Sequence, residues 1–178
     1  QGAYVGVPSG YAPGTGAQRL SYFYSSTSTS TLMNEPLSGM IMNYAEVQFI
    51  LAEAALKGWI SGSAETYYNR GVLNGITLWL PTWNKPIEDF LRNPNGNSNL
   101  LSDATTFDEK MEFIHLQKYY ALFLNDLQQW FEYRRTGHPT LPKGAGLRNG
   151  GVMPARMNYP VYVQSTNPTN YKAAVAAQ

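Results

Sequence analysis

The sequence contains no cysteine among its 178 residues. This absence excludes disulfide bonds, zinc sites with thiolate ligands and catalysis by a cysteine nucleophile. The sequence also lacks any run of about 18 apolar residues, so no membrane-spanning helix is predicted. The chain opens on Gln1 and Gly2 without a signal peptide, and its first residues resemble the middle of a loop. We therefore expect a fragment or trimmed form from which targeting information has been removed.

Charged residues are also scarce. They make up 14% of the chain, with a net charge of +1, whereas roughly a quarter of an average globular protein is charged. Such a balance produces no strong field that could steer a nucleic acid or a membrane surface. Lys and Arg do not cluster with aromatic residues as they do in nucleic-acid binders. We therefore expect no nucleic-acid partner.

Aromatic residues are abundant by comparison. The chain has 13 Tyr and 4 Trp, and aromatics account for 13% of its residues. A surface poor in charge and rich in tyrosine suits neutral polar partners such as sugars or peptides. The same composition also fits an extracytoplasmic protein whose loops merely contain many tyrosines, and composition alone does not decide between the two.

The order of residue types predicts one all-α domain in three parts. Residues 1–38 form a loop-rich segment, because glycines, prolines and a Ser/Thr run punctuate it throughout. Residues 39–137 carry apolar residues at helical spacing and form the helical scaffold. Residues 138–178 form a mostly coil tail. The first two scaffold helices are joined by a short connection, which predicts an antiparallel helical hairpin.

Helix starts are marked by capping residues. Asn43 precedes the first helix, Ser63 the second, and Thr106 with Glu109 forms a capping box before the third. Gly137 is placed to end the fourth helix. The expected helices are 43–58, 64–80, one after residue 106, 126–135, and a short terminal helix at 171–177 capped by Asn170.

Two arginines occupy the last turn of the fourth helix. Arg134 and Arg135 suit the negative end of the helix dipole there. Glu46 and Glu53, two turns apart on the first helix, are carboxylates in matching helical order. Arginine suits a planar, partly buried carboxylate pair better than lysine does. We therefore hypothesise a structural bidentate ion pair that joins Arg134 or Arg135 to Glu46 or Glu53.

The sequence predicts no catalytic or metal centre. Glu112 and His115 have the spacing of one di-iron ligand pair, but such sites need two such pairs and two further glutamates. The chain has 2 His, and His138 lies in a turn. Glu88 and Asp89 are adjacent and point apart, whereas glycosidase carboxylates face each other across roughly 5 to 10 Å. We expect no cofactor and no metal.

Loop aromatics are the candidate ligand contacts. Trp83 lies in a polar loop beside Asn84, where an indole can either cover the core or stack on a sugar ring. Tyr4, Tyr11 and Tyr24 lie in the N-terminal loop region and can either pack or contact a ligand. Amide groups such as that of Asn84 can orient sugar hydroxyls.

Several segments together resemble a known family. MNYAEVQFILAEAALKGW, YYNRGVLNGI, IHLQKYYALFLNDLQQWFEYRRTGHP and MPARMNYPVYVQSTNPTNY occur in this order. The order is similar to that in the C-terminal half of SusD/RagB-like proteins, and closest to the second SusD-like subgroup. The resemblance covers about residues 39–177. One departure is that Tyr159-Pro160 is not followed three residues later by the glutamate frequent in the family, since Val163 stands there.

The resemblance implies a fold, a function and a location. The fold is a scaffold of tetratricopeptide-like helix pairs with long irregular loops, of which this chain would be the C-terminal part. The function is the capture of oligosaccharides or other nutrients for a SusC-like TonB-dependent transporter, without enzymatic activity. The location is the outward face of the outer membrane, reached through a lipid anchor that this chain lacks.

Two other readings remain open. A tetratricopeptide-like protein-interaction module without a small-molecule site would show a concave groove lined by helix residues and no exposed loop aromatics. A carbohydrate-active enzyme would need a facing pair of carboxylates.

Overall fold

The computed structural model describes residues 40–92, 98–147 and 149–177. Its helices are α1 Tyr44–Leu56, α2 Ala64–Trp79, α3 Ile87–Leu91, the 3-10 turn η1 Leu101–Asp103, α4 Phe107–Ala121, α5 Gln128–Thr136, α6 Val163–Thr166 and α7 Pro168–Ala176. The described residues form no strand, only an isolated bridge between Arg92 and Ser98. The predicted all-α class is confirmed. None of the described helices has the length and apolar character needed to cross a membrane.

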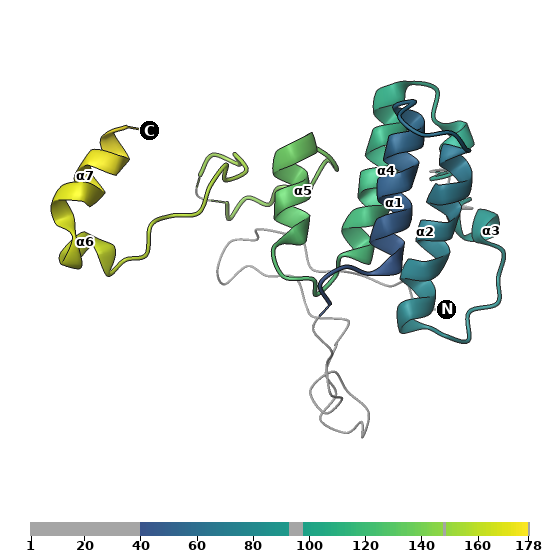
Figure 1. Cartoon of the computed structure of the whole chain (residues 1–178), viewed down its shortest axis with the longest axis horizontal. Coiled ribbons are helices and arrows are strands. Elements are labelled where there is room, and N and C mark those ends of the chain that lie inside the picture. The colour runs from purple at the N-terminus through teal and green to yellow at the C-terminus, as the bar shows by residue number, and fades with distance from the viewer. Residues whose placement is uncertain (1–39, 93–97, 148, 178) are drawn as a thin grey trace, which may run out of the picture.

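The core lies between α1, α2 and α4, which stand side by side in Figure 1. Phe49 of α1, Tyr68 of α2 and Ile114 of α4 are all 0% exposed. The rings of Phe49 and Tyr68 meet edge to face with their centroids 6.1 Å apart. The Tyr68 hydroxyl donates to the Asn99 carbonyl at 2.7 Å, so this buried polar group is satisfied.

Three of these helices begin at the capping residues that the sequence marks. Asn43 accepts a hydrogen bond from the Glu46 backbone at 2.7 Å, and Ser63 caps α2 in the same way. Thr106 and Glu109 form a reciprocal capping box at the start of α4. Each cap satisfies backbone donors that a helix start otherwise leaves free. The predicted starts of these three helices are confirmed.

Of two glycines on α2, one is required by the close approach of the helices. A Cβ added to Gly71 of α2 would lie 2.7 Å from the Phe49 ring. A Cβ added to Gly75 would meet the Ala121 Cβ at 3.4 Å, which is ordinary contact. Gly71 therefore occupies a position where the core has no room for a side chain, whereas Gly75 does not.

The helix α5 is attached differently. None of its residues is buried. Leu127, which precedes the helix, is 37% exposed, and Phe131 within it is 46% exposed. Helical spacing places Leu127, Trp130 and Phe131 on one side of this helix, but that side is not buried by any described element. Polar contacts hold α5 instead, such as the Gln129 amide, which donates to the Tyr119 carbonyl at 2.6 Å. Its predicted end at Gly137 is confirmed, with φ at 75°.

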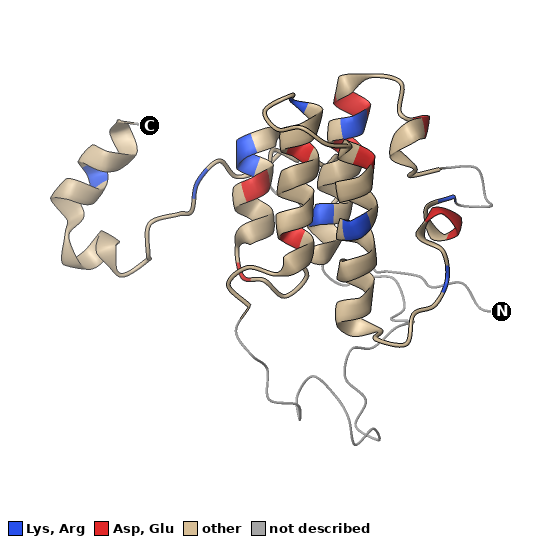
Figure 2. Cartoon of the chain, turned by 45° about the vertical axis from the view of Figure 1, so that its right-hand side comes forward, with Lys and Arg blue, Asp and Glu red and all other residues tan. Residues whose placement is uncertain are grey.

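The C-terminal helices lie apart from the bundle. Figures 1 and 2 both show α6 and α7 beyond an extended segment, and neither helix has a buried residue. α7 begins at Pro168 with Asn167 as its N-cap, so the predicted cap at Asn170 is wrong. The fixed φ of proline suits the first position of a helix, which moves the start upstream.

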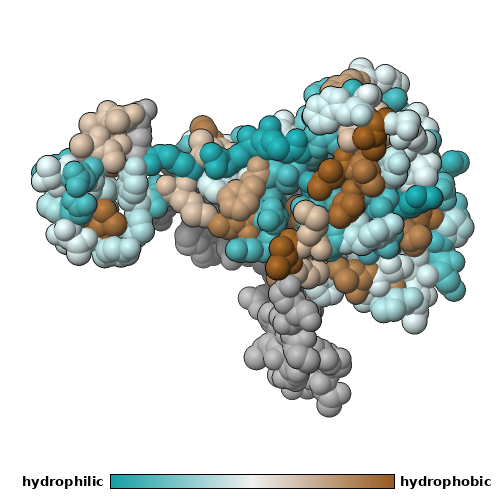
Figure 3. Space-filling view, in the orientation of Figure 1, coloured by the Kyte–Doolittle hydropathy of each residue, from teal (hydrophilic) through white to brown (hydrophobic). Residues whose placement is uncertain are grey.

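Apolar side chains also remain exposed on the bundle. Figure 3 shows apolar residues gathered over it, and Ile41, Tyr44 and Ile50 are 88%, 60% and 41% exposed. The three-helix bundle therefore has more apolar surface than its own core uses.

Candidate functional site

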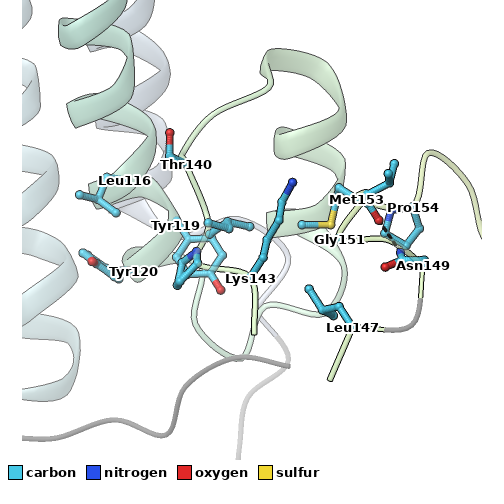
Figure 4. A pocket seen from close by; sticks show the side chains of 13 residues that line it. Leu116, Tyr119, Tyr120, Thr140, Lys143, Leu147, Asn149, Gly151, Met153 and Pro154 are labelled. Atoms are coloured by element: carbon cyan, nitrogen blue, oxygen red, sulfur yellow. Dashed lines mark hydrogen bonds between the residues drawn. The ribbon is translucent and has the colours of Figure 1, made fainter. Parts of the chain in front are cut away.

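A cavity of about 500 Å³ lies between α4 and the segment 140–154, shown in Figure 4. Its volume falls within the roughly 300–1,000 Å³ of small-molecule sites. Its lining residues are Leu116, Tyr119, Tyr120, Thr140, Leu141, Pro142, Lys143, Leu147, Asn149, Gly151, Val152, Met153 and Pro154. We call this cavity the α4 pocket.

One wall of the α4 pocket is a helix face. Leu116, Tyr119 and Tyr120 are three and four residues apart, so they lie on the same side of α4. The two tyrosine rings meet edge to face at 6.0 Å. Burial, aided by the neighbouring Tyr119, raises the pKa of the Tyr120 phenol. Tyr120 therefore stays a neutral hydroxyl that can both donate and accept hydrogen bonds.

The other wall is a segment anchored at both ends. At its start, the Thr140 backbone N–H donates to Glu112 Oε1 at 2.6 Å, and His138 Nδ1 lies 2.7 Å from Glu112 Oε2. At its end, the Trp130 indole donates to the Pro154 carbonyl at 2.9 Å. Burial acts to raise the pKa of Glu112, but the contacts from His138 and Thr140 outweigh it and lower that pKa. The ionised Glu112 thus holds the segment against α4.

The chemistry that the α4 pocket offers is non-covalent binding. Aromatic faces and aliphatic side chains supply apolar contact, and Thr140, Lys143 and the two phenols supply polar groups. No Asp, Glu or His occurs among the described lining residues. The lining therefore offers stacking and hydrogen bonds but no carboxylate pair for acid and base catalysis.

A second cluster is built of charges around Glu53, which is 5% exposed. Arg135 approaches it with both nitrogens, Nη1 at 2.9 Å from Oε1 and Nη2 at 2.6 Å from Oε2. Lys57 Nζ lies 2.5 Å from Oε1. Burial acts to raise the pKa of Glu53, but the contacts from Arg135, His115 and Lys57 outweigh it and hold that pKa far below its usual range.

The cluster extends to a second carboxylate, Glu132. Lys118 is 2% exposed and lies 2.9 Å from Glu132 Oε2, to which Arg135 also donates at 2.8 Å. His115 lies between the two glutamates, 3.4 Å from Glu53 and 3.9 Å from Glu132. Figure 2 shows acidic and basic residues on neighbouring helices of the bundle.

The donor atoms of Glu53, His115 and Glu132 lie within 4.8 Å of one another, close enough in principle for a metal ion. However, Arg135 already bonds to both carboxylates, and Lys118 bonds to Glu132. The charges of the two carboxylates are therefore already balanced by cationic side chains of the protein itself. We therefore interpret the cluster as a structural ion network that ties α1, α4 and α5 together.

The structure distinguishes among the four residues considered for the ion pair. Arg135 and Glu53 come together. Arg134 lies over the Trp130 ring at 4.8 Å instead, because successive residues of a helix point about 100° apart and residue 130 is one turn back. Glu46 is buried, and its Oε2 has no hydrogen-bond partner in the described part of the chain. The prediction is thus corrected for Arg134 and Glu46, which do not take part in the bidentate pair.

Two of the predicted ligand contacts, Trp83 and Asn84, do not line the α4 pocket. Trp83 packs edge to face on Phe90 at 5.5 Å, and its indole N–H donates to the Lys85 carbonyl at 2.9 Å. Asn84 is exposed. A ligand role for these residues stays a prediction. The three remaining candidates lie outside the described residues: Tyr4, Tyr11 and Tyr24.

Sequence reasoning missed Tyr119, Tyr120 and the segment 140–154. The signal present was a long segment rich in Gly and Pro directly after the helices, since loops longer than about 12–15 residues are commonly functional. Its partner on α4 could not be identified, because only the folded chain shows which helix face the segment covers.

Acidification is expected to destabilise the fold. The pKa values of Glu53, Glu112 and Glu132 are lowered from the ordinary 4.5, so their contribution is present above that pH and is lost as pH falls toward the folded-state values. Glu46 acts in the opposite sense, because burial raises its pKa, and Lys118 offsets this only in part. Urea titrations between about pH 7 and pH 3 should show a falling free energy of unfolding. Glu46→Gln should raise the free energy of unfolding at pH 7. A free energy of unfolding that stays constant between about pH 7 and pH 3 would contradict the ion network.

The family model and the solved structures that match this chain indicate one family. A family model described as "Starch-binding associating with outer membrane", SusD-like, matches residues 1–160. A comparison with curated proteins gives no match.

Several similar solved structures carry the same family name. The chain is similar to a SusD homologue from Bacteroides fragilis, with 33% identity and a TM-score of 0.59 over 78% of this chain and 31% of that one. A SusD-like protein from Bacteroidetes has 25% identity and a TM-score of 0.62, over 78% of this chain and 28% of that one. A chitin-binding protein has 31% identity and a TM-score of 0.57, over 75% of this chain and 29% of that one. The chain spans less than a third of the length of each of these structures. It belongs to the SusD-like family of outer-membrane-associated, nutrient-binding proteins.

Proposed function

We propose that the chain is part of a cell-surface protein that captures oligosaccharides without altering them and hands them to a SusC-like TonB-dependent transporter. The observation that carries the proposal is the match of residues 1–160 to a family described as starch-binding and associated with the outer membrane. A chitin-binding protein among the similar structures supports a glycan as the ligand. In the full-length protein, a lipid anchor would hold this module on the outward face of the outer membrane.

The α4 pocket is the place where such a ligand would bind. Tyr119 and Tyr120 offer aromatic surface for a sugar ring, and the phenols with Thr140 offer hydrogen bonds to hydroxyls. Ten of the thirteen lining residues come from the segment 140–154. A tetratricopeptide-like interaction module would instead use a groove lined by helix residues, so the pocket supports the glycan reading. Trp83 and Asn84 remain a second candidate contact.

Tyr119→Ala is expected to weaken glycan binding about tenfold, which corresponds to about 1.4 kcal/mol and is the size of one aromatic contact. Calorimetric titration of maltose- and chitin-type oligosaccharides against the chain and the variant measures this loss. Tyr162→Ala is the matched control, because Tyr162 is 66% exposed and lies on the separate C-terminal part. Mass spectrometry of the recovered sugars should show them intact.

The outcomes separate the alternatives. If none of these glycans or other saccharides binds, the proposed function is wrong. If Trp83→Ala abolishes binding while Tyr119→Ala does not, the ligand binds at the polar loop and not in the α4 pocket. Release of new reducing ends would indicate an enzyme.

A further inference from the structure

The α4 pocket has a single charged group among its described lining residues, Lys143. In Figure 4 the Lys143 side chain extends across the space between the α4 tyrosines and the segment around Met153. Its aliphatic stem runs along Gly151, where an added Cβ would lie 3.5 Å from Lys143 Cδ. The stem thus packs against the wall of the pocket, while Lys143 itself remains exposed to solvent at the pocket's lining.

Within the described part of the chain, the Lys143 ammonium has no counterion. No carboxylate of the described residues lies within 4.0 Å of it, and no acidic residue lines the pocket. Glu112, the carboxylate that anchors the start of the segment 140–154, is already engaged by Thr140 and His138. Among the residues that the structure describes, the pocket therefore has one positive charge without a carboxylate partner, beside two aromatic rings.

We propose that the α4 pocket selects saccharides that carry an anionic group, with Lys143 paired to that group while Tyr119 and Tyr120 contact the sugar ring. This inference rests on the proposed glycan-binding function and specifies its ligand class. A lysine suits the role because an ammonium binds an anion as a point charge and imposes little geometry. A neutral sugar leaves this charge with water alone, whereas a sugar carboxylate or sulfate forms a charge-assisted hydrogen bond with it.

The test compares three oligosaccharides of equal length: an oligogalacturonate, a sulfated galactan fragment and a neutral galactan fragment. Calorimetric titration of the whole chain should show about tenfold tighter binding of at least one anionic sugar than of the neutral one. The preference should shrink as NaCl rises from about 20 to about 300 mM, because salt screens a partly exposed pair. The two anionic sugars distinguish a carboxylate from a sulfate as the recognised group.

Variants assign the preference to one side chain. Lys143→Gln should remove the preference for the anionic sugar over the neutral one, and Lys143→Arg should retain that preference. Lys172→Gln on the separate α7 is the matched control for loss of one positive charge. Arg148→Gln is included because Arg148 stands between two lining residues in the sequence. Thermal unfolding of each variant verifies that the fold is intact.

The possible results are distinguishable. Equal or tighter binding of the neutral sugar would overturn this inference and leave the proposed function standing. A preference that survives Lys143→Gln, or that disappears only with Arg148→Gln, would also overturn the assignment to Lys143. Failure of every saccharide to bind would overturn the proposed function itself.

Discussion

Glu53→Gln is expected to lower the free energy of unfolding by about 3 kcal/mol, the lower end of the cost of breaking a buried ion pair. Glu53 is 5% exposed and accepts from Arg135 with both oxygens, while Lys57 lies at 2.5 Å. The amide keeps the shape of the side chain but removes the charge, so two cations lose their shared partner. In a chain of this size, the loss corresponds to a decrease in Tm of roughly 6–12 °C.

The two adjacent arginines provide the control. Arg134→Gln removes a cation that lies over the Trp130 ring, a contact worth no more than about 1 kcal/mol at an exposed site. Arg135→Gln should cost about 1–2 kcal/mol, because its side chain is 45% exposed and solvent screens part of the pair. Urea unfolding followed by circular dichroism measures all three variants. If Arg134→Gln costs as much as Glu53→Gln, the network does not hold α5 as described.

Gly71→Ala is the second variant with a large expected effect, a loss of about 1–3 kcal/mol from overpacking. The new methyl group would lie 2.7 Å from the Phe49 ring, and Phe49 is 0% exposed in the middle of the core. The ring cannot move aside without disturbing Tyr68, against which it packs. The penalty therefore exceeds the gain of about 1 kcal/mol that alanine usually brings to a helix.

Gly75→Ala makes the same chemical change one turn further along α2. Its Cβ would meet the Ala121 Cβ at 3.4 Å, so we expect unchanged stability or a gain of up to about 1 kcal/mol. The pair of variants separates the local propensity of the helix from the space available in the core. Equal gains in thermal unfolding for both variants would show that α1 and α2 are farther apart than the structure has them.

Local signals were the part of the fold that the sequence predicted well. The caps at Asn43, Ser63 and Thr106 bond to backbone within three residues, so their residue types suffice to place the helix starts. The ion pair was predicted as a type of contact, but the choice of Arg135 over Arg134 depends on how α5 is rotated against α1. That rotation is a tertiary quantity, and no local pattern contains it.

The exposed apolar face of α5 and the α4 pocket are features that the sequence patterns did not predict. Periodicity reveals that Leu127 and Phe131 share a side of a helix, but not whether anything in the chain covers that side. Likewise, the segment 140–154 has no regular pattern, and its place beside Tyr119 is set by the anchors at Glu112 and Trp130. Contacts between residues distant in sequence decide both features.

The two anchors of the segment 140–154 have a consequence for how binding preference can evolve. Glu112 accepts from a backbone N–H at one end of the segment, and the Trp130 indole donates to a backbone carbonyl at the other. Neither anchor depends on the side chains between them, so those residues are free to vary while the segment keeps its position. New ligand preferences can then arise by substitution within this segment, with the helices inherited unchanged.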